Sequence, residues 1–146
     1  MQKQELIANI ITLFPAMMKK FRGHSGFADI PKQQFMLLHT ISEHDNMPMN
    51  FYSERLLISK PNLTVLADKL IEAGYVERGA AQGDRRRIVL KMTDSGREYR
   101  NKIWRETTEN ISRKFEKMDS GTLERLNELI VEMSEIINKF DNLTED

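Results

Sequence analysis

One segment, residues 31–93, constrains the fold of this chain more than any other, because three helix patterns in it lead directly into a β-hairpin pattern. Pro31 can open the first helix, since proline lacks only an N–H group that the first helical turn leaves unpaired. A short second helix follows in NFYSERLL. The third has the N-cap residue Ser59 and an early Pro61, and it should end at Gly74. Two strand-like runs, YVERG and RRIVLKM, then flank AAQGDR, which predicts a hairpin with a long, basic tip.

The N-terminal part of the chain predicts one further helix. Its apolar residues between Leu6 and Phe21 repeat with a period of about 3.5 residues, which is the spacing of one helix face. Pro15 lies inside this pattern, and a proline within a helix removes a backbone hydrogen bond. We therefore expect a kink or a break around Phe14.

The C-terminal part predicts two long helices, the first capped by Thr93 and the second beginning at Ser120. The second has a seam whose members are spaced alternately by about three and four residues, as in a heptad pattern: Leu123, Leu126, Ile130, Met133, Ile137 and Phe140. The seam is too short for a free-standing coiled coil, so it indicates a helix packed into a bundle. The expected fold class is mainly α with a small β-hairpin.

Charge is unevenly distributed along a chain whose formal net charge is zero, with 22 basic and 22 acidic residues. Residues 60–92 have seven basic and four acidic side chains, a net charge of +3. Residues 116–146 have three basic and nine acidic side chains, a net charge of −6. This asymmetry fits a protein with one face that meets a polyanion, and it fits equally two solvated surfaces of different sign.

Several classes of protein are disfavoured by what the sequence lacks. The absence of cysteine excludes disulfides and thiolate chemistry. No apolar run approaches the ~20 residues needed to span a bilayer. No arrangement of residues stands out as catalytic, and His24, His39 and His44 lack the helical His-x-x-x-His spacing of a zinc site. We expect a cytoplasmic protein that is not an enzyme and has no membrane partner, cofactor or metal.

The order helix, helix, helix, hairpin is typical of a winged helix-turn-helix, in which one helix braces a second whose exposed residues enter the DNA major groove. The hairpin reaches the phosphates or the minor groove, where guanidinium groups are favoured. The arginines either contact DNA or only make the hairpin tip soluble. Asn62 either makes a bidentate bond to adenine or only caps the helix locally. The candidate DNA-binding residues are Ser59, Lys60, Asn62, Thr64, Val65, Lys69, Arg85, Arg86 and Arg87.

The sequence resembles the MarR family of bacterial transcriptional regulators over essentially its whole length. The family's wing signature is Asp-Arg-Arg running into an apolar strand and a Leu-Thr-x-x-Gly helix start, and here Met92 occupies the leucine position. The matching residues are Asp84, Arg85, Arg86, Ile88, Leu90, Met92, Thr93 and Gly96. LADKLIEAGYV looks like the end of the family's recognition helix with the strand after it, and IPKQQFMLL is similar to the start of its second helix.

This resemblance implies a homodimer in which the first and last helices of two subunits intertwine, while two winged domains bind a near-palindromic site in double-stranded DNA. The winged helix-turn-helix would comprise residues 31–93, and residues 1–22 and 94–146 would form the helical dimerisation part of a single chain. The implied function is sequence-specific transcriptional regulation, as a repressor relieved by a small-molecule effector. The alternative is a winged-helix module that binds protein without specific DNA binding.

The resemblance also implies roles for single residues, with two departures from the family pattern. Arg86 would enter the minor groove, and Asp84 would brace the wing by pairing with a neighbouring basic group. Leu57 stands where the bracing helix usually ends in glycine. Val65 stands where a polar residue is frequent, and it either contacts thymine methyl groups or marks weak or altered DNA binding. The residues that either line an effector cavity or simply form core are Phe14, Met17, Phe21, Phe35, His39 and Trp104.

Overall fold

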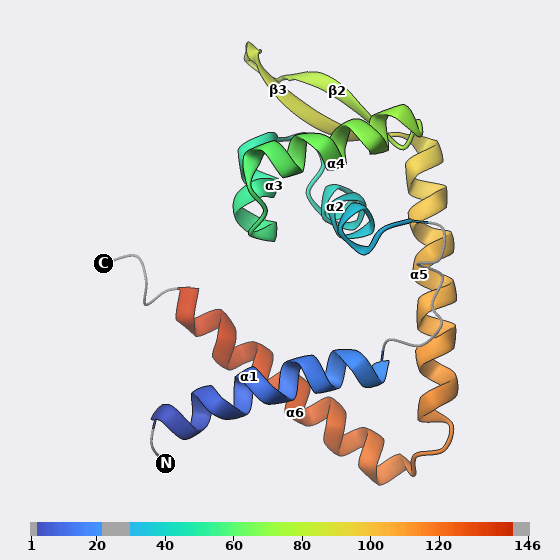
Figure 1. The fold of residues 1–146 in the computed structure, drawn as a ribbon. Coiled ribbons are helices and arrows are strands. Elements are labelled where there is room, and N and C mark those ends of the chain that lie inside the picture. Colours follow the sequence, from blue (N-terminus) through green and yellow to red (C-terminus); the bar gives the residue numbers. More distant parts are fainter. Residues whose placement is uncertain (1–2, 22–29, 142–146) are drawn as a thin grey trace. The chain divides into compact units, whose positions relative to one another are not determined.

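The structure of the protein is a computed structural model that describes residues 3–21 and 30–141. The loop around His24 and the side chains of Met18, Phe21 and Phe140 lie outside this described part. Six helices and three strands lie within the described ranges (Figure 1): α1 (Lys3–Phe21), α2 (Lys32–Glu43), β1 (Met47–Pro48), α3 (Met49–Leu56), α4 (Lys60–Glu72), β2 (Val76–Ala81), β3 (Asp84–Met92), α5 (Asp94–Phe115) and α6 (Ser120–Asp141). The predicted fold class, mainly α with a small hairpin, is confirmed. The chain divides into two compact units whose boundary falls between Thr108 and Glu109, inside α5.

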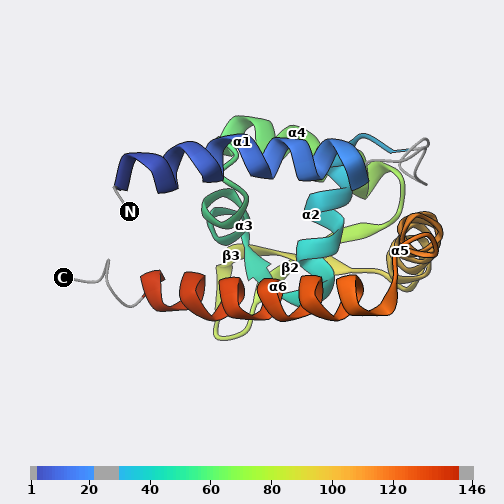
Figure 2. The same cartoon turned by 90° about the horizontal axis from the view of Figure 1, so that it is seen from below.

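Helices α2, α3 and α4 pack together and against the sheet, as both views of the ribbon show (Figures 1 and 2). One face of α4 points inward, since Leu63, Leu66, Ala67 and Leu70 are buried and Ile71 is half-buried. Full burial of such a side chain contributes about 1.5–3 kcal/mol. Their partners in the core include Leu37, Leu38, Ile41, Tyr52, Val76, Leu90 and Ile103. This packing leaves the opposite face of α4 free for another function.

The three strands form an antiparallel sheet in the order β1-β3-β2. Tyr52 anchors the short strand β1, since its buried hydroxyl donates a hydrogen bond to the His44 carbonyl oxygen at 2.5 Å and accepts one from the Met47 N–H at 3.3 Å. Burial raises the pKa of Tyr52 to about 12. The β1 edge is therefore held by the helix that follows it.

The hairpin of β2 and β3, called the wing below, differs from the prediction. A long tip over AAQGDR was expected, but the turn consists of Gln82 and Gly83 alone, and Gly83 has a φ of +84° that favours glycine. The arginines belong to β3. Ala80 pairs with Ile88 and the next residue, Ala81, pairs with Asp84, so residues 85–87 form a bulge opposite no β2 residue. The bulge separates the arginines from the regular ladder.

A kink or a break was expected around Phe14, and the break is absent, since α1 continues as one helix from Lys3 to Phe21. The fixed φ of proline suits a helix, so the residue removes one backbone bond without ending the element. The apolar stripe of α1 is exposed, with fractions from 45% at Leu6 to 65% at Leu13. Within residues 3–21 and 30–141, no helix combines the length and the apolar character needed to cross a membrane.

Both C-terminal helices begin where the sequence predicts. The Thr93 Oγ1 atom accepts a hydrogen bond from the Gly96 N–H at 3.0 Å, which caps α5, and donates one to the Gly74 carbonyl oxygen at 2.7 Å. Helix α6 starts at Ser120, although the capping side chain is Asp119, whose Oδ1 atom accepts from the Thr122 N–H at 2.9 Å. Much of the predicted seam on α6 is exposed, as at Met133 with 47%.

Candidate nucleic-acid interface

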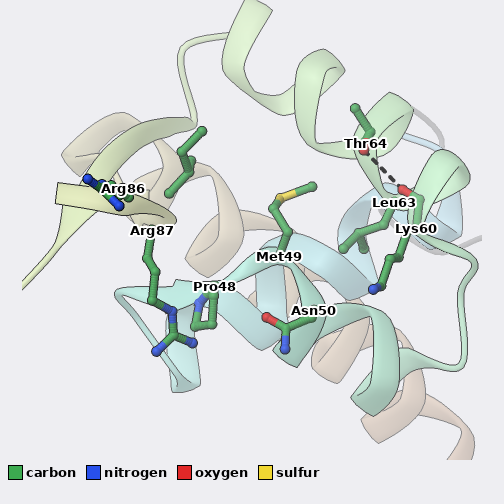
Figure 3. Close-up of a pocket in the computed structure, with 9 residues that line it drawn as sticks. Pro48, Met49, Asn50, Lys60, Leu63, Thr64, Arg86 and Arg87 are labelled. Carbon is green, nitrogen blue, oxygen red and sulfur yellow. Dashed lines mark hydrogen bonds between the residues drawn. The ribbon is translucent and has the colours of Figure 1, made fainter. Parts of the chain in front are cut away.

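A groove of about 500 Å³ lies between the start of α4 and the wing, and we call it the inner groove (Figure 3). Its apolar lining consists of Pro48, Met49, Leu63 and Ile88. Its polar lining consists of Asn50, Lys60, Thr64, Arg86 and Arg87. The fold therefore brings together four of the predicted DNA-binding residues, from two elements that are separated in the sequence, around one positively charged groove.

The remaining candidates on α4 lie on its exposed side. Asn62, Val65 and Lys69 are exposed, and the Val65 side chain retains 53% of its accessible surface. Val65 therefore points away from the core. Ser59 is the N-cap residue by position but makes no side-chain capping bond, so its hydroxyl is available to other partners. The Thr64 hydroxyl instead donates to the Lys60 carbonyl oxygen at 3.0 Å within the helix.

Asp84 does not make the contact that the family resemblance implied. A pairing with a neighbouring basic group was expected, but the Asp84 Oδ1 atom accepts a hydrogen bond from the backbone N–H of Arg86 at 3.0 Å. This contact spans the bulge and leaves the arginine side chains uncommitted to Asp84. Arg86 and Arg87 leave β3 in different directions, with Arg87 extending toward Pro48 (Figure 3).

The wing is tied to α4 by an ion pair that the sequence analysis missed. A guanidinium nitrogen of Arg78 on β2 contacts the Asp68 carboxylate on α4. Both side chains are about half-exposed, so the pair contributes at most about 1 kcal/mol to stability. Its geometric effect is to join the two elements that border the inner groove. No local spacing signals such a pair, because the two residues meet only through the tertiary fold.

Leu57 forms the turn between α3 and α4 in a conformation that suits glycine. Its φ of 53° and ψ of 41° place it in the left-handed region, and its side chain is 93% exposed. The position keeps the backbone geometry expected of the family's glycine while presenting a leucine side chain to solvent.

Three of the predicted effector residues form a single stack between α2 and α5. The His39 ring lies parallel to the Trp104 ring, with centroids 4.9 Å apart. The Phe35 ring also stacks on His39, with centroids 6.1 Å apart. Phe35 is itself buried, which fits the core alternative. Phe14 and Met17 lie on α1, where Phe14 is exposed and Met17 is half-buried.

The stack includes one cation that the sequence analysis missed. The Arg100 guanidinium lies 4.9 Å from the Trp104 ring centroid, and its Nε atom donates to His39 Nδ1 at 3.1 Å. The Glu43 carboxylate lies 3.7 Å from His39 Nε2. Burial, and then the Arg100 charge, lower the pKa of His39, while Glu43 raises it to a smaller extent. Burial and the Arg100 charge therefore both disfavour the protonated imidazole.

Comparison with known proteins agrees with this arrangement. A MarR family model matches residues 28–87. The sequence is 27% identical over 121 residues to the HTH-type transcriptional regulator FarR of Neisseria gonorrhoeae, covering 83% of each chain. A MarR family protein from Bacillus stearothermophilus has a similar structure, with a TM-score of 0.78, 13% identity, and coverage of 94% of this chain and 99% of that one.

A further solved structure, NadR in complex with 4-hydroxyphenylacetate, has a TM-score of 0.63 at 26% identity and covers 88% of this chain and 92% of its own. Of these proteins, FarR is named as a transcriptional regulator and the Bacillus stearothermophilus protein as a member of the MarR family. The family match includes every residue that lines the inner groove except Ile88, and the structural similarity extends over nearly the whole chain. This chain has the fold of MarR family winged helix-turn-helix proteins, and its sequence is similar to that family over residues 28–87 and to a transcriptional regulator over most of its length.

Proposed function

We propose that α4 enters the major groove of duplex DNA while the wing enters the adjoining minor groove. The observation that carries this proposal is the inner groove, where Lys60, Arg86 and Arg87 gather beside the exposed face of α4. Phosphate contacts from cations position a protein on DNA, and base-edge contacts from the helix specify the sequence. Arg86 reads the narrow minor groove, and the uncommitted Ser59 hydroxyl contacts the backbone.

On the helix, the exposed side chains of Asn62, Val65 and Lys69 face the bases. Asn62 is suited to a bidentate bond with adenine, and the Val65 methyl groups are suited to contact with the C5-methyl group of thymine. Arg85 lies in the bulge of β3 and adds positive charge near the phosphates. Asp84 braces the wing through the Arg86 backbone, so its removal should loosen the bulge without removing a DNA contact.

The protein acts as a homodimer on a near-palindromic site. This part of the proposal is supported by the exposed apolar faces of α1 and α6, which one chain alone leaves in contact with water. Residues 31–93 would form the DNA-binding part of each subunit, and residues 1–22 and 94–146 the dimerisation part. Two identical winged domains related by a twofold axis read two half-sites of opposite orientation.

Binding of a small aromatic effector relieves repression. The support is the stack of His39 and Trp104 with the Arg100 cation, which offers an aromatic surface and a partner for an anion. NadR, a structural relative, is described in complex with 4-hydroxyphenylacetate, an aromatic carboxylate. Release of DNA requires that the effector bind more tightly to a conformation with low DNA affinity.

A salt titration with duplex DNA tests the central part of this proposal. The wild-type protein is used to select sites from a random pool, and binding to a selected and a scrambled duplex is then measured at several salt concentrations. We expect tighter binding to the selected duplex and a steep loss of affinity for both as salt rises. Absence of binding to either duplex at low salt would favour a winged-helix module that binds protein.

A further inference from the structure

A second groove, of about 840 Å³, lies on the wing and includes no residue of α4 in its lining. We call it the outer groove. Val89 and Lys91 line it, and both alternate along β3 with Leu90 and Met92, which face the helical core. Since successive side chains of a strand point to opposite faces, the outer groove lies on the face of the sheet turned away from that core.

We propose that the outer groove binds the sugar–phosphate backbone of DNA that flanks each half-site, through Arg87 and Lys91. The proposal rests on the DNA-binding mode proposed above and extends it. A minor groove is bounded by two backbones. When the wing enters it, one backbone lies between the wing and α4, in the inner groove. The other must then lie along the opposite side of the wing, where the outer groove is found.

The chemistry of the outer groove suits a backbone. Its lining contains the two cations Arg87 and Lys91 and the three amides Asn46, Asn50 and Gln82, without any carboxylate. Cations and amide donors are the groups that proteins use most to hold phosphate oxygens. Phe51 is half-buried and provides apolar surface in the same lining, which can pack against deoxyribose.

Lys91 is positioned for this contact by the glycine beside it. In the register of the hairpin, Lys91 lies opposite Glu77. A Cβ atom added at Gly79 would nevertheless lie only 2.6 Å from Lys91 Cε and 3.2 Å from Lys91 Nζ. The lysine side chain therefore lies across Gly79, leaning from its position opposite Glu77 toward the turn of the hairpin. Glycine at position 79 leaves the space that this orientation needs.

The two grooves are continuous through shared residues. Pro48, Asn50 and Arg87 line both of them, so Arg87 lies where the two surfaces meet. A DNA duplex that occupies the inner groove consequently has its neighbouring backbone close to Lys91. The footprint of each subunit should extend outward past the minor groove that Arg86 enters.

Duplex length separates this flanking contact from the contacts within the half-sites. One selected duplex ends at the last base pair that Arg86 contacts beside each half-site, so it lacks the backbone beyond the wing. A longer duplex continues by about one helical turn, about 10 base pairs, at each end. On the long duplex, Lys91→Gln should weaken binding several-fold at low salt and lower the slope of log affinity against log salt by about one per wing. On the short duplex, Lys91→Gln should have the same affinity and the same salt slope as wild type. Lys91→Arg should retain wild-type behaviour on both.

Lys102→Gln is the matched control, because Lys102 is an exposed lysine of α5 that lines neither groove. It should leave the affinity for both duplexes unchanged. Equal affinity of Lys91→Gln and wild type on the long duplex would overturn the proposal, and so would an equal loss on both lengths. Failure of the wild-type protein to bind either duplex would be a different result, since it would reject the DNA-binding mode itself.

Discussion

At the scale of single residues, Leu57 holds a backbone conformation that costs an L-amino acid roughly 1–2 kcal/mol. Its φ of 53° ends α3, and its side chain gains little from burial because it is 93% exposed. Leu57→Gly should therefore raise the free energy of unfolding by about 1 kcal/mol, measured by chemical denaturation at fixed protein concentration. Leu57→Ala is the matched control, since it shortens the side chain and keeps the strain. Equal stability of the glycine and alanine variants would contradict this account.

His39 makes the stability of the protein dependent on pH. Burial, and then Arg100, lower its pKa below the ordinary value of 6.5, against a smaller opposing effect of Glu43. Because the folded pKa lies below the unfolded one, the unfolded state binds more protons as the pH falls past about 6.5. The folded state should lose stability there relative to its stability at neutral pH.

The comparison that isolates this effect is wild type against His39→Gln, which removes the titrating group and retains a polar side chain. We expect the difference in unfolding free energy between the two proteins to shift in favour of the variant as the pH is lowered from 8 to 5. A difference that is constant over this range, or that shifts in favour of wild type, would show that the pKa of His39 is not lowered in the folded protein.

At the scale of elements, the junction between the wing and α5 depends on the absence of a side chain at Gly96. A Cβ atom there would lie 2.0 Å from the Tyr75 carbonyl oxygen, which is backbone and cannot rotate away. Gly96→Ala should destabilise the protein by about 3 kcal/mol or more, seen as a lower melting temperature.

The control for this change is Gly121→Ala in the first turn of α6. Its added Cβ would meet only the Asp119 side chain, at 3.3 Å, and alanine favours helix. We expect little loss or a small gain in melting temperature. If Gly96→Ala were as stable as Gly121→Ala, the close approach of α5 to Tyr75 would not exist in solution.

Most of the elements could be predicted because their signals are local. Helix starts are marked by residues that suit the first helical turn or cap it, here Pro31, Ser59 with Pro61, and Thr93. A helix begins at each of these three places in the structure. The hairpin tip was placed wrongly because the bulge at residues 85–87 depends on strand pairing, which has no local signal. A kink or a break of α1 was expected around Phe14 because the cost of Pro15 was weighed without the rest of the helix, and the helix does not break.

The candidate site was predictable to the extent that it follows helical periodicity. The exposure of Val65 and the burial of Leu66 and Leu70 follow directly from the spacing of apolar residues in α4. Periodicity could not predict two other contacts, the Arg78–Asp68 ion pair and the placement of Arg100 beside Trp104. Each of them joins two elements that meet only in the folded protein. For the same reason, the partner of Asp84 was expected to be a side chain and is a backbone N–H group.

At the scale of the whole molecule, we expect the exposed apolar faces of α1 and α6 to be covered by a second copy of the chain. Met133 is 47% exposed in the single chain, so Met133→Asp costs little unless the residue is buried in a dimer. Wild type should sediment as a dimer at micromolar concentration, and Met133→Asp should be monomeric or unfolded. Glu135→Lys, on the side of α6 away from the seam, should remain dimeric. A stable wild-type monomer would rule out this assembly.

The central claim is that the wing and α4 divide the reading of DNA between them, and salt titrations of Arg86→Ala and Val65→Ala on selected and scrambled duplexes test it most directly. Arg86→Ala should weaken binding to every sequence and flatten the slope of log affinity against log salt by about one unit per wing. Val65→Ala should keep the wild-type slope and lose preference for thymine at one position in each half-site. If Arg86→Ala left both affinity and slope unchanged, the arginines of β3 would be a solvated hairpin and the proposed mode of DNA binding would be wrong.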